Sequence, residues 1–325
     1  MEYFFKYSII TAILIVLEII YFPIAKRYRI GSEVTSRSSH NKFIITGAGF
    51  IFYISALLFY VFFSSELPAS FPIMLLGASI LAIISFYDDI KNLAPWLRLV
   101  IQIAVVAITF NQIFIDGFYE IYLLILICGV GFINAYNFMD GINGILVGYT
   151  IVTLSTLLYC FNFSVNIPES GLIQFITPLI ISAIILGIFN FRTKAICFSG
   201  DVGSIVMGFF ILYLMIELIL TTSEASYIIF LIVYAIDTVF TIFQRLFAGD
   251  NIFLPHRLHL YQILANQWGI KHYNVSLIYA SIQLIINIIY ILIPEDFKWS
   301  YFIFITTILV IVYFTLKRLP ISKQQ

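Results

Sequence analysis

The stretch "YLLILICGVGFI-NAYNFMDGINGI-LVGYTIVTLSTLLYC" covers residues 122–133, 134–145 and 146–160, and its three parts differ in character. The two outer parts are mainly apolar, whereas residues 134–145 contain three asparagines, an aspartate and two glycines. An apolar run of roughly 20 residues is long enough to cross the hydrocarbon core of a bilayer. The stretch therefore predicts two membrane-spanning helices joined by a polar turn at one membrane face.

The rest of the chain repeats this apolar character. Of its 325 residues, 62% are hydrophobic and only 10% are charged, whereas soluble domains are about half apolar and a quarter charged. No segment alternates polar and apolar residues as the strands of a membrane barrel do. The composition predicts one all-α polytopic membrane domain over residues 1–325, with eleven spans at about 4–25, 43–63, 71–87, 97–111, 119–136, 144–163, 172–190, 203–220, 226–246, 273–292 and 299–316.

Positive charge is distributed unevenly between the connecting loops. With the amino terminus outside, the inner loops are 26–42, 88–96, 137–143, 191–202 and 247–272, followed by the tail after 316. All 17 lysines and arginines lie in or beside those regions except Lys6 and Lys298. Cytoplasmic loops are enriched in Lys and Arg, so we expect a multi-pass protein of the cytoplasmic (inner) membrane with its amino terminus outside.

The acidic residues of the inner side gather at helix ends. They lie in "SFYDDIKNL" at 85–93, in the opening stretch, in "FSGDVGSIVMGF" at 198–209, and in the long loop that also contains "PHRLHLYQ". Each motif alone has a structural alternative: a solvated helix end, close packing at glycine, or a helix cap made by Ser199 or Asp201. Separate caps need not converge on one membrane face, and this convergence favours a single polar site.

The residue types in these motifs indicate a chemistry. Aspartate and asparagine oxygens suit Mg²⁺ or Mn²⁺, whereas the scattered cysteines do not suit zinc. A helix that begins beside Asp201 could offer backbone N–H groups to an anion, and Arg98, Arg245, Arg257 and Lys271 add positive charge. The combination predicts phosphoryl transfer that involves a lipid. A net charge of zero without a basic run predicts no nucleic-acid partner.

Five motifs in this order resemble a known family. They are "RSSH" at 37–40, "DDIKNL" at 88–93, "NAYNFMDGING" at 134–144, "GDVGS" at 200–204 and "HRLHLYQ" at 256–262. The chain is similar to the polyprenyl-phosphate N-acetylhexosamine-1-phosphate transferases, which are glycosyltransferase family 4 and the superfamily of WecA and MraY. The motifs are spread over nearly the whole chain, and each lies at the predicted inner end of a span.

The resemblance implies an enzyme that moves an N-acetylhexosamine 1-phosphate from a UDP-sugar to undecaprenyl phosphate and releases UMP. It implies Mg²⁺, or Mn²⁺, on Asn137 and Asp201. It places Asp88 and Asp89 at the lipid phosphate, where orientation is favoured over base catalysis because a phosphate has its second pKa near ~6. The remaining residues that it implies are Arg98 at the diphosphate, His256, Arg257 and His259 at phosphate and sugar, Gly200 and Ser204 at the substrate, and Asn134, Asp140 and Asn143 on the nucleotide side.

The chain departs from the family pattern at two places. Asn143 stands where bacterial relatives carry a second aspartate, so a metal ligand at that position is not expected. A proline- and arginine-containing run that follows "RSSH" in relatives is replaced by "NKFIITGAG", which leaves Lys42 as a substitute phosphate contact. The motif "HRLHLYQ" is similar to the subgroup that initiates O-antigen and capsule synthesis, which we favour over an MraY-type phospho-MurNAc-pentapeptide transferase.

Other functions are also compatible with parts of the sequence. A secondary transporter would explain acidic residues within spans, namely Glu18, Glu217 and Asp237, but its site would lie near the bilayer midplane and its halves would repeat. A nonenzymatic assembly subunit would leave the motif residues without a role. Asp237 either takes the place of a recurrent family aspartate or pairs with another helix. The sequence leaves the identity of the sugar open, and the enzyme could act as a homodimer.

Overall fold

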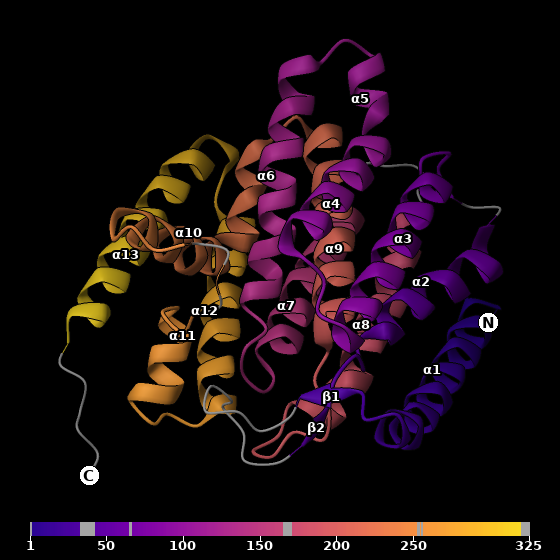
Figure 1. The fold of residues 1–325 in the computed structure, drawn as a ribbon. Coiled ribbons are helices and arrows are strands. Elements are labelled where there is room, and N and C mark those ends of the chain that lie inside the picture. Colours follow the sequence, from indigo (N-terminus) through magenta and orange to yellow (C-terminus); the bar gives the residue numbers. More distant parts are fainter. Residues whose placement is uncertain are drawn as a thin grey trace.

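The computed structural model describes residues 2–32, 43–64, 67–164, 171–251, 254 and 256–319 (Figure 1). Its elements are α1 Glu2–Arg27, β1 Gly31–Ser32, β2 Ile44–Ile45, α2 Phe50–Phe63, α3 Phe71–Ile90, α4 Pro95–Thr109, α5 Asn111–Ile115, α6 Tyr119–Phe138, α7 Ile145–Tyr159, the π-helical turn η2 Cys160–Ser164, α8 Leu172–Asn190, α9 Gly200–Thr222, the 3₁₀ helix η3 Ala225–Leu231, α10 Ile232–Phe247, α11 Leu260–Gln262, the π-helical turn η4 Ile263–Gln267, α12 His272–Leu292, the 3₁₀ turn η5 Glu295–Phe297 and α13 Lys298–Arg318.

The helices confirm an all-α polytopic membrane protein. In the described part of the chain, nine helical segments are long and apolar enough to cross a bilayer. The predicted spans at 43–63 and 97–111 correspond to the shorter apolar helices α2 and α4, of 14 and 15 residues. The opening stretch forms α6 and α7, which are separated by the turn after Phe138.

The first residues of the predicted span 43–63 are not helical. Ile44 and Ile45 pair with β1, and the chain then lies against the segment that precedes α9. The backbone N–H of Phe198 donates to Ile45 O (2.7 Å), and Gly49 N donates to Ser199 O (2.9 Å). Hydrophobicity in this segment therefore reflects burial beside the 197–199 loop, and α2 begins only at Phe50.

Helix α9 is the centre of the bundle. Of its most apolar 18 residues, 89% are buried inside the protein, against 6% for the segment that contains α13. It packs against α2, α3 and α6, while α1 and α13 lie at opposite sides of the bundle (Figure 1). The residues at the start of α9 are thereby surrounded by the ends of several helices.

The span at 226–246 is broken between η3 and α10. The freed backbone groups are bound by Gln283 of α12, whose Oε1 accepts from Val233 N (3.1 Å) and whose Nε2 donates to Ile229 O (2.9 Å). The same side chain accepts from the Tyr149 hydroxyl (2.6 Å). Such side-chain partners make a helix break tolerable where no water is available.

Candidate active site

Asp88 and Arg98 join the end of α3 to the start of α4. Asp88 is 8% exposed, and its Oδ2 lies 2.7 Å from Nη1 of Arg98. Its other oxygen accepts the backbone N–H of Leu93. Pro95 starts α4 and fixes the turn from which Arg98 reaches back to α3.

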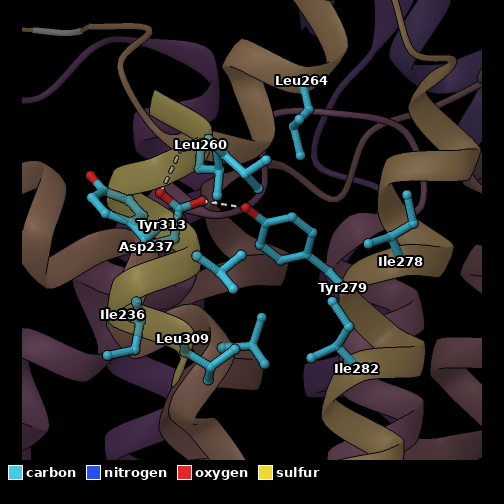
Figure 2. A pocket seen from close by; sticks show the side chains of 12 residues that line it. Ile236, Asp237, Leu260, Leu264, Ile278, Tyr279, Ile282, Leu309 and Tyr313 are labelled. Carbon is cyan, nitrogen blue, oxygen red and sulfur yellow. Dashed lines mark hydrogen bonds between the residues drawn. The ribbon is translucent and has the colours of Figure 1, made fainter. Parts of the chain in front are cut away.

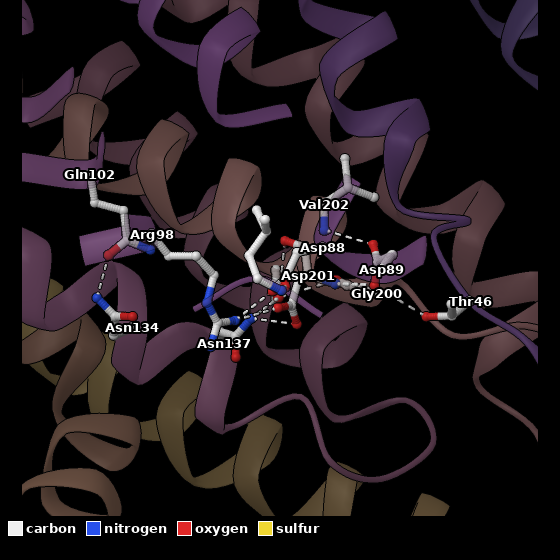
Figure 3. A network of polar contacts seen from close by, with 12 residues as sticks. Thr46, Asp88, Asp89, Arg98, Gln102, Asn134, Asn137, Gly200, Asp201 and Val202 are labelled. Carbon is white, nitrogen blue, oxygen red and sulfur yellow. Dashed lines mark hydrogen bonds and ion pairs between the residues drawn. The ribbon is translucent and has the colours of Figure 1, made fainter. Parts of the chain in front are cut away.

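The same guanidinium nitrogen reaches Asp201 on α9. Nη1 of Arg98 lies 2.8 Å from Asp201 Oδ2, so one cation bridges two carboxylates (Figure 3). The Arg98 and Asp201 side chains are 30% and 31% exposed, whereas that of Asp88 is 7% exposed. The trio carries one positive and two negative formal charges, and its open side consists of Arg98 and Asp201.

Asn137 connects Asp201 to the end of α6. Its Nδ2 donates to Asp201 Oδ1 (2.9 Å) and to the Ser204 hydroxyl oxygen (3.1 Å). Ser204 lies one turn into α9 and donates to Gly200 O (3.1 Å). The motifs that begin at residues 88, 134 and 200 therefore meet at one point of the fold.

Asp89 does not face this cluster. Its two oxygens accept the backbone N–H groups of Asp201 (2.9 Å) and Val202 (3.1 Å), so Asp89 caps the first turn of α9. The structural alternative for this motif is a cap made by Ser199 or Asp201, but the side chain that caps α9 is that of Asp89. The N–H groups expected to bind an anion are occupied by this carboxylate, so phosphate contacts must come from other groups.

Gly200 makes this cap possible. Its φ is +72°, and a Cβ at this position would lie 2.5 Å from Asp89 Oδ2 and 2.6 Å from the backbone nitrogen of Gly47. Both the left-handed backbone and the close approach require glycine. The described contacts therefore explain why position 200 is a glycine. Its expected contact with substrate stays a prediction.

The last turn of α6 and the turn that follows it are held to neighbouring segments by the side chains of Asn134, Asp140 and Asn143. Asn134 donates to Gln102 Oε1 (2.6 Å), the Ser199 hydroxyl donates to Asp140 Oδ2, and Asn143 donates to Arg192 O (2.8 Å). Gln102 is 2% exposed and was not predicted. It follows Arg98 by one helical turn as a polar residue in an apolar run, and that position could have identified it. Roles of Asn134, Asp140 and Asn143 toward a nucleotide stay predictions.

The pKa of the Asp140 carboxyl is raised to about 7, chiefly by burial; the Ser199 hydroxyl lowers this pKa and the Asp201 charge raises it, and both effects are smaller than that of burial. An unfolded aspartate releases its proton near pH ~4, so the folded protein holds one proton more between about pH 4 and 7. The free energy of unfolding is therefore expected to fall as the pH rises through this window, by at most about 1.4 kcal/mol per pH unit.

The measurement is thermal unfolding in detergent from pH 5 to 8 for wild type and Asp140→Asn. The melting temperature of the variant should gain on that of wild type up to about pH 7, and this gain should level off toward pH ~8. Asp116→Asn changes an exposed carboxylate that accepts from Gln112 and serves as the control. A wild-type-to-variant difference that does not change with pH would contradict the assignment.

The histidine motif lies beside the end of α6. The His259 ring is 6.4 Å from that of Phe138 and 4.9 Å from that of His256, measured between centroids. Burial, and then the charges of His259, Arg245 and Lys317, lower the pKa of His256 to about 4, so this ring is neutral at pH 7. Arg257 is half-buried next to it. Contacts of His256 and Arg257 with phosphate or sugar stay predictions.

The donor set for a divalent cation is small. The described residues contain no group of three or more His, Cys, Asp or Glu side chains placed to hold a metal ion. Asp201 and Asn137 remain as two adjacent hard donors, once the Asn137 amide turns its oxygen toward the site. Mg²⁺ is usually held by one or two carboxylates together with waters and substrate phosphates, so this pair fits a Mg²⁺ ion that binds with a nucleotide diphosphate.

Two sequence features are not among the contacts of the cluster described above. The "RSSH" motif and Lys42 lie outside the described residues. Glu18 of α1 is fully buried; its Oε1 accepts from the Cys197 thiol (3.9 Å), and its Oε2 has no partner within the described chain.

Comparison with known proteins agrees with the motifs. Residues 71–219 match the family described as Glycosyl transferase family 4. A "Probable undecaprenyl-phosphate N-acetylglucosaminyl 1-phosphate transferase" of Bacillus subtilis (strain 168) is 26% identical over 331 residues, which cover 94% of this chain and 88% of that relative. An "Undecaprenyl-phosphate alpha-N-acetylglucosaminyl 1-phosphate transferase" of Escherichia coli (strain K12) is 30% identical over 58% of this chain and 56% of its own length.

A third bacterium provides a further match. A "Decaprenyl-phosphate N-acetylglucosaminephosphotransferase" of Mycolicibacterium smegmatis is 31% identical over 192 residues, which cover 50% of this chain and 45% of that relative. The matched region of the family contains Asp88, Asn137 and Asp201, the residues that meet at the start of α9. Residues 71–219 thus match glycosyltransferase family 4, and the chain is similar to undecaprenyl- and decaprenyl-phosphate N-acetylglucosaminyl 1-phosphate transferases of bacteria.

Proposed function

We propose that this protein transfers an N-acetylhexosamine 1-phosphate from a UDP-sugar to undecaprenyl phosphate. The observation that carries the proposal is the Arg98 bridge between Asp88 and Asp201, with Asn137 beside it, at the ends of membrane spans. The relatives named above act on undecaprenyl or decaprenyl phosphate by their names. N-acetylglucosamine is the first candidate for the sugar.

The reaction exchanges one phosphoanhydride bond for another. An oxygen of the lipid phosphate bonds to the sugar-bearing phosphorus of the UDP-sugar, and the bond from that phosphorus to the bridging oxygen breaks. The bridging oxygen leaves with UMP. Because a phosphate monoester with a second pKa near ~6 is largely ionised at pH 7, the nucleophile needs orientation more than deprotonation.

The surroundings of Asp88 support an orienting role. Its two oxygens already accept from Arg98 and from the Leu93 backbone, so Asp88 acts by placing the Arg98 guanidinium. The planar guanidinium can bind two phosphate oxygens at once. We assign Arg98 to the phosphates between which the sugar 1-phosphate is transferred, where fixed positive charge stabilises the charge of the transition state.

Asp201 and Asn137 would hold Mg²⁺, with Mn²⁺ as the alternative ion. When bound, the ion would neutralise charge on the diphosphate and align it. The remaining site residues bind and orient: Ser204 holds Asn137, and Asp140 and Ser199 keep the α6–α7 turn against the segment that leads into Asp201.

The product would start a lipid-linked surface glycan such as O-antigen or capsule. We propose that the site faces the cytoplasm from the inner membrane. The loops on the same side as the site hold most of the lysines and arginines, and loops rich in these residues are usually cytoplasmic. A UDP-sugar would then arrive from the cytosol, and the lipid phosphate would arrive along the leaflet.

The test is a transfer assay in sealed membrane vesicles that contain the protein, in inverted and in right-side-out preparations. Vesicles receive undecaprenyl phosphate, Mg²⁺ and one of UDP-N-acetylglucosamine, UDP-N-acetylgalactosamine or UDP-MurNAc-pentapeptide. The expected result is UMP release with a labelled lipid product, from an N-acetylhexosamine donor, in inverted vesicles only. Membranes without the protein serve as the control.

Each other outcome has a distinct meaning. A product from UDP-MurNAc-pentapeptide alone would replace glycan initiation by cell-wall precursor synthesis. Uptake of intact UDP-sugar without UMP would indicate a transporter. Activity in right-side-out vesicles alone would overturn the orientation, and no product from any donor would overturn the proposed reaction.

A further inference from the structure

Asp237 is a buried carboxylate that is not among the residues proposed above for the transfer. It lies on α10, is 2% exposed, and lines a small cavity of about 80 Å³ between α10, α12 and α13 that is otherwise mainly apolar (Figure 2). Its oxygens accept the backbone N–H groups of Leu260 (2.8 Å) and Tyr261 (3.1 Å) and the hydroxyl of Tyr279 (2.7 Å). Asp237 thus holds the first turn of α11 to the bundle.

His259 lies directly before this turn and faces the same carboxylate. Its Nδ1 is 3.4 Å from Asp237 Oδ1, slightly beyond a normal hydrogen bond. The ring is 2% exposed and stacks on Tyr261, with centroids 5.7 Å apart and an interplanar angle of 19°. Neither ring nitrogen makes a hydrogen bond of normal geometry within the described residues, and Nδ1 alone lies at ion-pair distance from a carboxylate. A buried ring nitrogen without a partner is unfavourable and requires an explanation.

Tyr261 connects this arrangement to the cluster around Asp201. Its hydroxyl donates to Phe138 O (2.8 Å), the carbonyl next to Asn137. A Cβ at Gly141 would lie 2.1 Å from the same hydroxyl, so the α6–α7 turn fits tightly against Tyr261. The position of His259 relative to Asn137 is therefore set by Asp237 on one side and Tyr261 on the other.

We propose that Asp237 is a positioning residue for the transfer reaction, one that holds a proton of His259 on Nδ1 and turns Nε2 toward the substrates, where Nε2 donates to a phosphate oxygen once it also carries a proton. A carboxylate at one ring nitrogen fixes the proton there and so selects the nitrogen that faces the substrate. When the ring carries a second proton, Nε2 donates to phosphate, and Asp237 balances the charge of the ring. This inference rests on the proposed function for the identity of the substrate.

A purely structural cap of α11 would not select a ring nitrogen, and ¹⁵N NMR measures that choice. The protein is labelled with ¹⁵N-histidine, and the His259 signals are assigned by their absence from His259→Gln; the sequence has four histidines in total. The wild-type protein is expected to carry a proton on Nδ1 of His259. An imidazole protonated on Nε2 alone would overturn the proposal.

The activity arm compares Asp237→Asn with Glu217→Gln, which makes the same chemical change at another acidic residue within a span. In Asp237→Asn an amide N–H₂ replaces one acceptor beside the α11 backbone, and kcat for UMP release should fall about 10- to 100-fold, as for other groups that orient a functional histidine. Glu217→Gln should keep wild-type turnover.

The outcomes separate this inference from the proposed function. Wild-type turnover and an unchanged His259 spectrum in Asp237→Asn would overturn the positioning role while the transfer reaction stood. If that variant does not fold, the wild-type spectrum decides. A wild-type protein that releases no UMP would overturn the proposed function. The protonation pattern of His259 would then still show whether Asp237 fixes the proton on Nδ1.

Discussion

Asp201→Asn is expected to lower UMP release by about a thousandfold, the size of effect seen when one preorganised charge-stabilising group is removed from an active site. Asp201 is the meeting point of the cluster, because its two oxygens contact Arg98 and Asn137 (2.8 and 2.9 Å). Asparagine keeps the shape but removes the charge and one of the oxygens. Arg98 would then be held by Asp88 alone, and the proposed Mg²⁺ ion would lose its only charged ligand.

The comparison uses Glu217→Gln on the same helix as control, with UMP release and melting temperature measured for both variants. Mg²⁺ with a UDP-sugar should raise the melting temperature of wild type and of Glu217→Gln, because a ligand that binds only the folded state stabilises it. The rise should be lost in Asp201→Asn. Wild-type activity together with a wild-type Mg²⁺ response in Asp201→Asn would remove Asp201 from the mechanism.

Gly200→Ala is expected to have the second largest effect. Alanine at φ +72° is strained, and its Cβ would overlap Asp89 Oδ2 and the Gly47 backbone. The two effects should destabilise the protein by about 2–5 kcal/mol. Because Asp89 holds the first turn of α9, its displacement shifts Asp201, and a misplacement of about 1 Å can lower a rate about a hundredfold.

The matched control is Gly131→Ala on α6. A Cβ at Gly131 has no atom within 4 Å among the residues considered, and its backbone is helical. Melting temperature and UMP release of this variant should remain near wild type. If Gly200→Ala melts and turns over like Gly131→Ala, the Asp89 cap is not needed to hold Asp201 in place.

Much of the helical framework could be predicted because a helix that spans the bilayer needs about 20 mainly apolar residues. Hydrophobic length alone located a helix in each of the eleven predicted segments. Two departures have distant causes. The helix at 43–63 starts late because residues 44–49 pair with residues 197–199, and the break at 231 is tolerated because Gln283 binds the freed backbone. Gly47 and Gly49 are a local signal for the late start of α2, whereas residues 227–236 contain no proline, glycine or charged residue that would mark the break at 231.

The site could be predicted as a set of residues but not as a set of contacts. Motif order and inner-face placement selected Asp88, Asn137 and Asp201, which the structure brings together. The two members of the "DD" pair have identical chemistry, yet one meets Arg98 and the other caps α9. Tyr261 gave no signal, because an aromatic residue near a membrane face is common, and its link to Phe138 exists only once the helices pack.

One carboxylate arrangement occurs twice in the fold. Asp89 accepts two consecutive backbone N–H groups of α9, and Asp237 accepts two consecutive groups of α11. In each case a charged side chain from an earlier helix holds the first turn of a later one beside the site. The backbone groups at these two helix ends are therefore not free to bind another anion, which leaves the phosphates of the proposed substrates to cationic side chains and to the proposed metal ion.

The Asp89 cap also has a consequence for the order of biosynthesis. Asp89 and the α9 residue that it holds are 112 residues apart in the chain, so at the usual pace of translation α3 emerges about 5–20 s before its partner. Until α9 arrives, the carboxylate has no backbone partner and is held at the water boundary by its charge. We expect the final seating of α3 to wait for α9, so that insertion of the central helix completes the catalytic face and the amino-terminal half alone cannot form it.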